Sequence, residues 1–245
     1  MHSEYKRIVP GAECAFLFLH GILGTPRHFD AFVELVPGNV SVYNLLLDGH
    51  GKGVTDFSRT SMAKWEAQVH SAVSELTQTH EKLFIAAHSM GCLLAVGEAI
   101  REPKIAGLFF LAAPMQLFLK PRMVANSMKV YFNRIRPDDG PGMAAKRCCG
   151  ISHSPNFLLY FGWIPRFLEL FQKIRQTRNQ LSSLSVPCAA YQSARDEMVS
   201  RRSTQVLGKN HHIRVTELPS SSHFYYAPGD QELLRNAFSD FVQRT

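Results

Sequence analysis

The ten residues 83–92 place the tightest limit on how this chain folds. They begin with an apolar run typical of a buried strand, pass through Ala87-His88-Ser89-Met90-Gly91, and lead into apolar residues with helical spacing. A serine between a strand and a helix, with small residues two places before and after it, is typical of the strained G-x-S-x-G elbow. Ala87 replaces the first glycine of that pattern. The stretch predicts that Ser89 stands above the strand end, at the positive end of the helix dipole.

Apolar runs and helical patterns alternate along most of the chain. The expected strands are 15–19, 40–47, 83–87, 107–111, 187–192 and 213–218. The expected helices are 26–36 (capped by Thr25), 61–78, 90–100, 200–207 and 230–242. This alternation predicts an α/β fold, a mostly parallel sheet with both faces covered by helices.

The alternation breaks between Met115 and Leu184, where we expect helices, no strand, and a hinge at 137–142. The sequence therefore predicts a core formed by 1–114 and 185–245, with a helical insertion at 115–184. An aromatic and apolar patch within this insertion includes Phe157, Phe161 and Trp163.

The insertion also carries most of the excess positive charge. The formal net charge of the whole chain is +7 at pH 7. The only acidic residues in 115–184 are Asp138, Asp139 and Glu169. The basic residues there are Lys120, Arg122, Lys129, Arg134, Arg136, Lys146, Arg147, Arg166, Lys173, Arg175 and Arg178. Such a segment suits an anionic ligand or transient contact with an anionic lipid surface, or is simply a solvated face. No nucleic-acid-binding motif accompanies it, so nucleic acid is not an expected partner.

The cysteines and the N-terminus favour a cytoplasmic protein with reduced thiols. The cysteine number, 5, is odd, and the Cys148-Cys149 pair lacks the spacing of a zinc site. Residues 1–10 lack the apolar core of a secretory signal. No stretch approaches the roughly 20 apolar residues that cross a bilayer. We expect no metal; the oligomeric state and the role of Cys148-Cys149 stay open.

Three residues have the types and the order that a serine nucleophile requires. A serine hydroxyl becomes nucleophilic when a histidine accepts its proton, and a carboxylate orients that histidine. Ser89, Asp196 and His223 each follow an expected strand, so they should meet at one edge of the sheet. Glu197 competes with Asp196, which is nearer the strand end. The histidines that we set aside lie beside the nucleophile, in the insertion or at the other sheet end: His88, His153, His211 and His212.

A serine that attacks a carbonyl group also needs two N–H donors for the oxyanion. We assign these to the backbone of Met90, directly after the nucleophile, and of Ile22, in the loop after strand 15–19. His20 shapes that loop as a hydrogen-bonded structural histidine, or contacts the substrate. His50 is expected to hold its own glycine-rich loop. Arg27 and His28 either border the site or cap a surface, and their role stays open.

These motifs together resemble the α/β-hydrolase superfamily, and more narrowly small bacterial carboxylesterases and monoacylglycerol-lipase-like serine hydrolases. The resemblance rests on six segments: 20–26 (HGILGTP), 49–51 (GHG), 87–91 (AHSMG), 113–115 (APM), 194–198 (ARDEM) and 222–223 (SH). It implies a cap inserted after Ala113-Pro114 and carboxylic ester hydrolysis through an acyl-enzyme, without metal or cofactor. Asp48 stands where such relatives often carry proline, and its role stays open.

The sequence thus predicts a serine esterase for a small ester with an apolar acyl chain, such as a monoacylglycerol. The patch with Phe157, Phe161 and Trp163 is expected to form the acyl pocket, unless it only packs the insertion onto the core. A thioesterase, lysophospholipase or acyltransferase would use the same three residues. A non-catalytic, ligand-binding protein is the remaining alternative.

Overall fold

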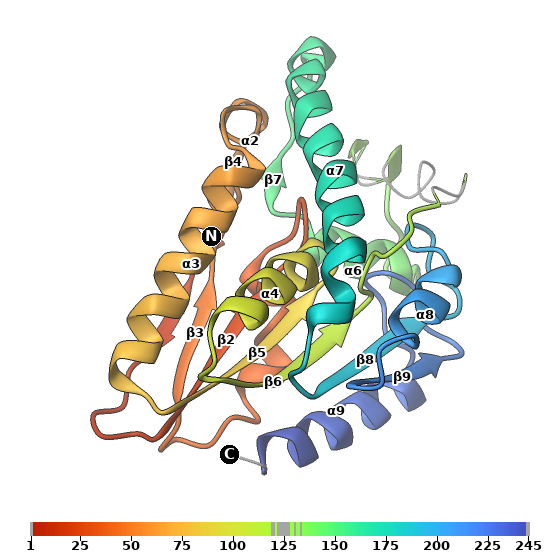
Figure 1. The fold of residues 1–245 in the computed structure, drawn as a ribbon. Helices are drawn as coiled ribbons and strands as arrows, with labels where there is room; N and C mark the ends of the chain where they lie inside the picture. The colour runs from red at the N-terminus through yellow and green to blue at the C-terminus, as the bar shows by residue number, and fades with distance from the viewer. Residues whose placement is uncertain (1, 119–120, 122–127, 130, 133, 244–245) are drawn as a thin grey trace.

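The structure, a computed structural model, describes residues 2–118, 121, 128–129, 131–132 and 134–243. Figure 1 shows a twisted sheet between layers of helices. The strand order is β1-β3-β2-β5-β6-β8-β9, and only β1 runs antiparallel to its neighbour. The strands are β1 (Tyr5–Arg7), β2 (Cys14–Leu19), β3 (Ser41–Leu45), β5 (Lys82–His88), β6 (Ile105–Leu111), β8 (Cys188–Ser193) and β9 (Ile213–Leu218). The predicted α/β fold with a mostly parallel sheet is confirmed.

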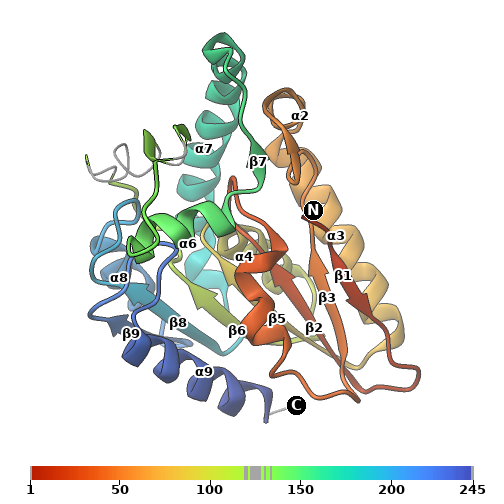
Figure 2. The ribbon, with the colours of Figure 1, turned by 180° about the vertical axis from the view of Figure 1, so that it is seen from behind.

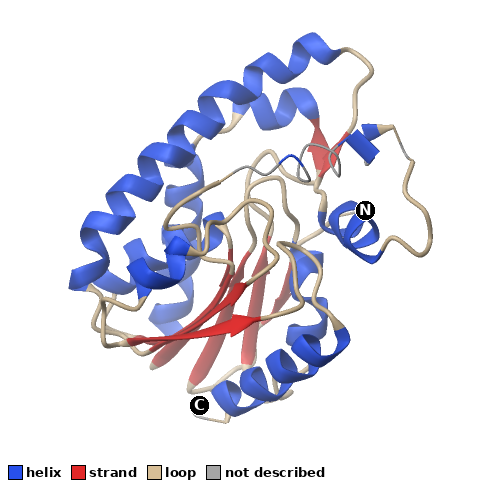
Figure 3. Cartoon of the chain, turned by 90° about the vertical axis from the view of Figure 1, so that its right-hand side faces the viewer, coloured by secondary structure: helices blue, strands red, loops and turns tan. Residues whose placement is uncertain are grey.

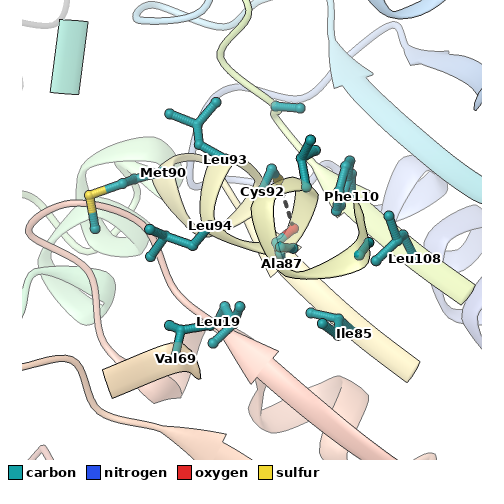
Figure 4. Close-up of a cluster of buried hydrophobic side chains, with 14 of the residues drawn as sticks. Leu19, Val69, Ile85, Ala87, Met90, Cys92, Leu93, Leu94, Leu108 and Phe110 are labelled. Carbon is teal, nitrogen blue, oxygen red and sulfur yellow. Dashed lines mark hydrogen bonds between the residues drawn. The ribbon is translucent and has the colours of Figure 1, made fainter. Parts of the chain in front are cut away.

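Helices cover both faces of this sheet, as Figures 1 and 2 show from opposite sides. One face carries α3 (Met62–Thr79) and α4 (Met90–Arg101). The other carries η1 (Pro26–Phe29), α1 (Asp30–Val33) and α9 (Pro228–Val242), while α8 (Arg202–Leu207) lies beside β9. Each face buries an apolar cluster, and Figure 4 shows the one around α4. Burial on both faces explains why the central strands read as continuous apolar runs.

The expected helix at 26–36 is shorter than its spacing suggested. It consists of η1 and the four residues of α1, and the α-helix ends at Val33, followed by turns up to Val36. The Thr25 hydroxyl makes no capping hydrogen bond and is buried without a partner in the described structure. Phe29 and Phe32 are buried against the sheet. Their spacing therefore reflects packing on the sheet, and it resembles the spacing of a longer helix.

The segment 115–184 departs from expectation in two places. It holds α6 (Gly140–Cys148), β7 (Ile151–Ser152), η2 (Phe157–Trp163), α7 (Ile164–Gln180) and η3 (Leu181–Ser183). The prediction of no strand was wrong, because β7 pairs in parallel with β4 (Lys52–Gly53), just before α2 (Val54–Arg59). The expected hinge at 137–142 instead starts α6, where Asp139 Oδ1 accepts a hydrogen bond of 3.0 Å from the Gly142 amide. An aspartate at this position satisfies a free N–H of the first helical turn.

Candidate active site

Ser89 sits at the elbow between β5 and α4 in a strained backbone conformation. Its φ of 51° lies in the left-handed region, with ψ at −122°. Non-glycine residues adopt this region at a cost of about 1–3 kcal/mol, and such strain gathers at functional sites. The Ser89 amide donates to the Leu111 carbonyl over 2.9 Å, which ties the elbow to the end of β6. A Cβ on Gly91 would lie 2.2 Å from the Leu19 carbonyl oxygen, so α4 starts directly against β2.

Asp196 and His223 meet above the ends of β8 and β9. His223 Nδ1 donates to Asp196 Oδ2 over 2.8 Å, and both side chains are buried. The other carboxylate oxygen of Asp196 accepts the amides of Met198 and Val199, each at 2.7 Å. Glu197 Oε2 instead accepts the His223 amide at 3.2 Å. Asp196 therefore binds the ring, and Glu197 holds the backbone.

This environment keeps His223 basic despite its burial. Burial disfavours the imidazolium, but the charge and hydrogen bond of Asp196 and the charge of Glu197 outweigh it and raise the pKa of His223. Donation from Nδ1 also fixes the neutral tautomer that leaves a lone pair on Nε2. Nε2 is the atom that would accept a serine proton.

His88, which was set aside from the sequence, connects the elbow to the His223 loop. Its Nε2 donates to the His223 carbonyl over 3.0 Å, and the two ring centroids are 4.8 Å apart. Because His88 precedes Ser89, this contact brings the serine segment beside His223. In the described structure no hydrogen bond joins the Ser89 hydroxyl to the His223 ring. Such bonds are often long in the absence of substrate.

The loop after β2 lies against Ser89, where the oxyanion donors were expected. A Cβ on Gly21 would be 2.8 Å from Ser89 Cβ, so only glycine fits there without a shift. Gly21 is followed by Ile22, which puts the backbone of Ile22 in the loop that contacts Ser89. Met90 is the first residue of α4, so its N–H has no acceptor within the helix.

Both ring nitrogens of His20 are engaged by the backbone. Nε2 accepts the Leu47 amide at 3.1 Å, so Nδ1 carries the proton and donates to the Gly21 carbonyl at 2.9 Å. Burial and the neighbouring His50 lower the pKa of His20 well below its usual range. This arrangement supports the structural role of His20 over contact with substrate.

The three aromatic candidates for substrate contact lie in η2 and differ in their surroundings. Trp163 packs on Phe57 at a ring distance of 5.0 Å and donates from Nε1 to the Val54 carbonyl at 3.1 Å. Phe157 and Phe161 are exposed. Their assignment to an acyl pocket stays a prediction.

His28, whose place at the border of the site or on the surface the sequence left open, is buried. Its ring stacks on His88 with centroids 3.9 Å apart, and its Nε2 lies 3.1 Å from the Tyr226 hydroxyl. Its Nδ1 lies 3.6 Å from Cys148 Sγ at the end of α6. The stacked rings of His28 and His88 thus connect Cys148, in the 115–184 segment, to the backbone of His223. No spacing in the sequence distinguishes His28, because the contact depends on packing between distant segments.

The buried histidines predict a loss of stability in acid. Burial lowers the pKa of His28 to about 3 and that of His50 to about 4, and it lowers those of His20 and His88 well below 6.5. Below about pH 6.5 these histidines are protonated in the unfolded chain but stay neutral in the folded chain. The free energy of unfolding therefore decreases as the pH is lowered from about 6.5 to the folded-state pKa of each histidine. His223, whose pKa is raised, keeps its contribution below pH 6.5 and loses it as pH rises above its folded pKa.

Urea unfolding at pH 7.5 and at pH 5.5 measures this effect. Each such histidine contributes a slope of up to about 1.4 kcal/mol per pH unit, so we expect a loss of several kcal/mol. The variant His50→Phe removes one proton-binding group and should flatten the slope. An unfolding free energy that is equal at both pH values would contradict the assigned neutral state of these histidines.

None of the helices among the described residues combines the length and the hydropathy of a membrane span. Nor do three or more metal-binding side chains gather among the described residues. The five cysteines form no disulfide in the described structure.

Solved structures share this fold at low sequence identity. A structure reported with LipS and LipT, two metagenome-derived lipolytic enzymes, is 20% identical with a TM-score of 0.74, covering 100% of this chain and 98% of that one. Monoacylglycerol lipase from Paleococcus ferrophilus is 18% identical with a TM-score of 0.67, covering 100% of each chain. Est1E from Butyrivibrio proteoclasticus, bound to ferulic acid, is 17% identical with a TM-score of 0.65, covering 99% and 94%.

Sequence comparisons give the family assignment. A search of curated protein sequences found no significant match. A model of the alpha/beta hydrolase family matches residues 16–234, which include the elbow, Asp196 and His223. This match covers most of the chain and agrees with the sheet order and the strained serine described above. The chain belongs to the alpha/beta hydrolase family.

Proposed function

We propose that this protein is a serine hydrolase that cleaves carboxylic esters through an acyl-enzyme. The hydrogen bond between buried His223 and Asp196, beside the strained Ser89 elbow, carries the proposal. This arrangement supplies a nucleophile, a base of raised pKa and a carboxylate that fixes its tautomer. The alternative of a binding protein gives no reason for either the strain at Ser89 or the buried pair.

In the proposed reaction, the Ser89 oxygen attacks the ester carbonyl while His223 Nε2 accepts the serine proton. The N–H groups of Met90 and Ile22 stabilise the oxyanion. When the carbonyl re-forms, the alcohol leaves with the proton from His223, and the acyl group stays on Ser89. Water then attacks the acyl-enzyme, with His223 again as base, and releases the carboxylic acid.

We further propose an apolar acyl chain as the preferred substrate feature, with residues 115–184 as a cap over Ser89. Gly150 supports this placement of the segment, because its amide donates to the Leu23 carbonyl in the oxyanion loop over 2.7 Å. Similar folds include a monoacylglycerol lipase and an esterase bound to ferulic acid. In this proposal the acyl chain lies between this segment and the sheet, with its carbonyl carbon at the Ser89 hydroxyl.

A fluorophosphonate probe tests the nucleophile directly, since it phosphonylates an activated serine. We expect the wild type to be labelled, with the label mapping to the peptide containing Ser89. The variant Ser89→Ala should lose labelling and ester hydrolysis while keeping its unfolding midpoint. Ser71→Ala, an exposed serine on α3, is the matched control and should label like the wild type. Labelling of Ser89→Ala, or none of the wild type, would overturn the assignment.

A further inference from the structure

The segment from η2 into α7 exposes an apolar ridge that no other element of the described residues covers. In a 3-10 helix, residues three apart lie on one line, and in an α-helix residues three and four apart share a face. These spacings connect five exposed side chains, which are between 46% and 61% accessible to solvent. We call them the ridge: Leu158, Phe161, Ile164, Leu168 and Phe171. A connected set of large apolar side chains at this exposure is typical of an interaction surface.

The opposite face of α7 is fixed to the core. Leu170 and Ile174 belong to the buried cluster around α4. Buried Lys173 pairs with Glu66 on α3 over 2.6 Å. Near the start of α7, Arg166 donates to the Ser58 carbonyl over 2.9 Å. These contacts hold α7 in place, so the ridge is a fixed feature of the surface. In Figures 1 and 3 the N-terminal end of α7 projects beyond the sheet and its covering helices.

Positive charge continues the ridge along the same helix face. Arg175 follows Phe171 by four residues, and Arg178 follows Arg175 by three, so both lie on the line of the ridge. Both are exposed, and neither forms an ion pair within the described part of the chain. They border a groove of about 390 Å³ that Phe171 and Leu117 also line. Apolar side chains and unpaired guanidinium groups therefore meet at one place.

We infer that this face, the ridge together with Arg175 and Arg178, docks on an anionic lipid surface. An amphipathic helix with an apolar line and arginines lies in the plane of such a surface, with its apolar side chains below the headgroups. Arginines near anionic headgroups gain roughly 1 kcal/mol each, or about fivefold in partitioning. The ridge supplies the apolar contact, and the unpaired arginines supply the charge complementarity. This inference goes beyond the proposed ester hydrolysis and does not depend on it.

Co-sedimentation with vesicles tests the inference, using Ser89→Ala so that lipid cleavage cannot alter the surface. Two vesicles are compared: phosphatidylcholine alone, and phosphatidylcholine with about 30% phosphatidylglycerol as the anionic lipid. We expect at least about tenfold stronger binding to the anionic vesicles, reduced by added salt because salt screens exposed charges.

Two double variants separate the apolar and the charged contributions. Phe161→Ser with Leu168→Ser should weaken binding to both vesicles at least about tenfold. Arg175→Gln with Arg178→Gln should remove most of the preference for anionic vesicles. At about fivefold for each arginine, this loss is about 25-fold. The matched controls are Leu233→Ser on α9 and Arg202→Gln with Arg214→Gln near β9, all exposed residues away from the ridge. These controls should bind like the parent protein.

Several results would overturn the inference. Absence of binding by the parent protein, or unchanged binding by both double variants, would exclude lipid docking on this face. A ridge variant of the active enzyme that lost hydrolysis of a water-soluble ester but kept vesicle binding would assign the ridge to the substrate. A parent protein that formed dimers, which the ridge variant dissociated, would assign it to a second copy. Vesicle binding is measured with a variant that lacks the serine nucleophile. A lack of binding would therefore contradict lipid docking alone and not the proposed hydrolase function.

Discussion

Replacement of Asp196 by asparagine should lower kcat/KM for a carboxylic ester about 10⁴-fold while the fold is retained. The reason lies in the two amides of Met198 and Val199, which donate to Oδ1. They will hold the amide oxygen of asparagine in that place and turn its NH₂ group toward His223 Nδ1. A donor facing Nδ1 stabilises the tautomer protonated at Nε2, and that tautomer cannot accept the serine proton. Steady-state hydrolysis of a soluble ester measures the loss.

The pH profile separates this tautomer effect from a general disturbance. In the wild type, kcat/KM should fall in acid with a midpoint above 6.5, because the pKa of His223 is raised and only the neutral ring acts as base. Removing the carboxylate charge in Asp196→Asn lowers that pKa, so the residual activity should persist to lower pH.

Glu197→Gln is the matched control for Asp196→Asn. It removes a neighbouring charge but keeps an oxygen for the His223 amide, so it should shift the midpoint slightly and cost less than about tenfold in rate. Equal losses in the two variants, or an Asp196→Asn enzyme with wild-type activity, would show that Asp196 does not set the state of His223.

The main fold was predictable because its signals are local and repeated. Each central strand is buried on both faces, so it appears in the sequence as an apolar run. Because the strands are parallel, the residues that follow their C-terminal ends lie at one edge of the sheet. β9 begins and ends at the residues expected from its pattern, Ile213 and Leu218. The meeting of Asp196 and His223 follows from that geometry.

The missed elements have no such local signal. β4 and β7 contain two residues each, and they exist because Lys52 lies opposite Ile151 in a distant part of the chain. The contacts of His88 and His28 likewise arise where the end of β5, the helix η1 and the loop of His223 pack together. An isolated histidine in sequence gives no sign of whether it will face solvent, a carbonyl or another ring. Such contacts have to be read from the structure.

Gly91 and Gly97 lie in one helix, α4, yet alanine should have opposite effects at the two positions. A Cβ at Gly91 would lie 2.2 Å from the carbonyl oxygen and 2.8 Å from the carbonyl carbon of Leu19. Both are backbone atoms of β2, so relief requires the helix and the strand to separate. At Gly97 the nearest atoms, in the side chains of Arg101 and Lys173, are 3.6 Å away, which is an ordinary van der Waals distance.

Gly91→Ala should therefore lower the free energy of unfolding by more than about 4 kcal/mol. This exceeds the usual cost of overpacking, because the clash is with backbone atoms of Leu19, which cannot move aside as a side chain can. Gly97→Ala should raise it by about 0.5–1 kcal/mol, because alanine restricts the unfolded chain in a position with helical geometry. Urea unfolding measures both values. Since α4 begins at Met90, its displacement also moves the elbow, so Gly91→Ala should react more slowly with a fluorophosphonate even where it is folded. Equal stabilities of the two variants would mean that α4 does not press on β2 at Gly91.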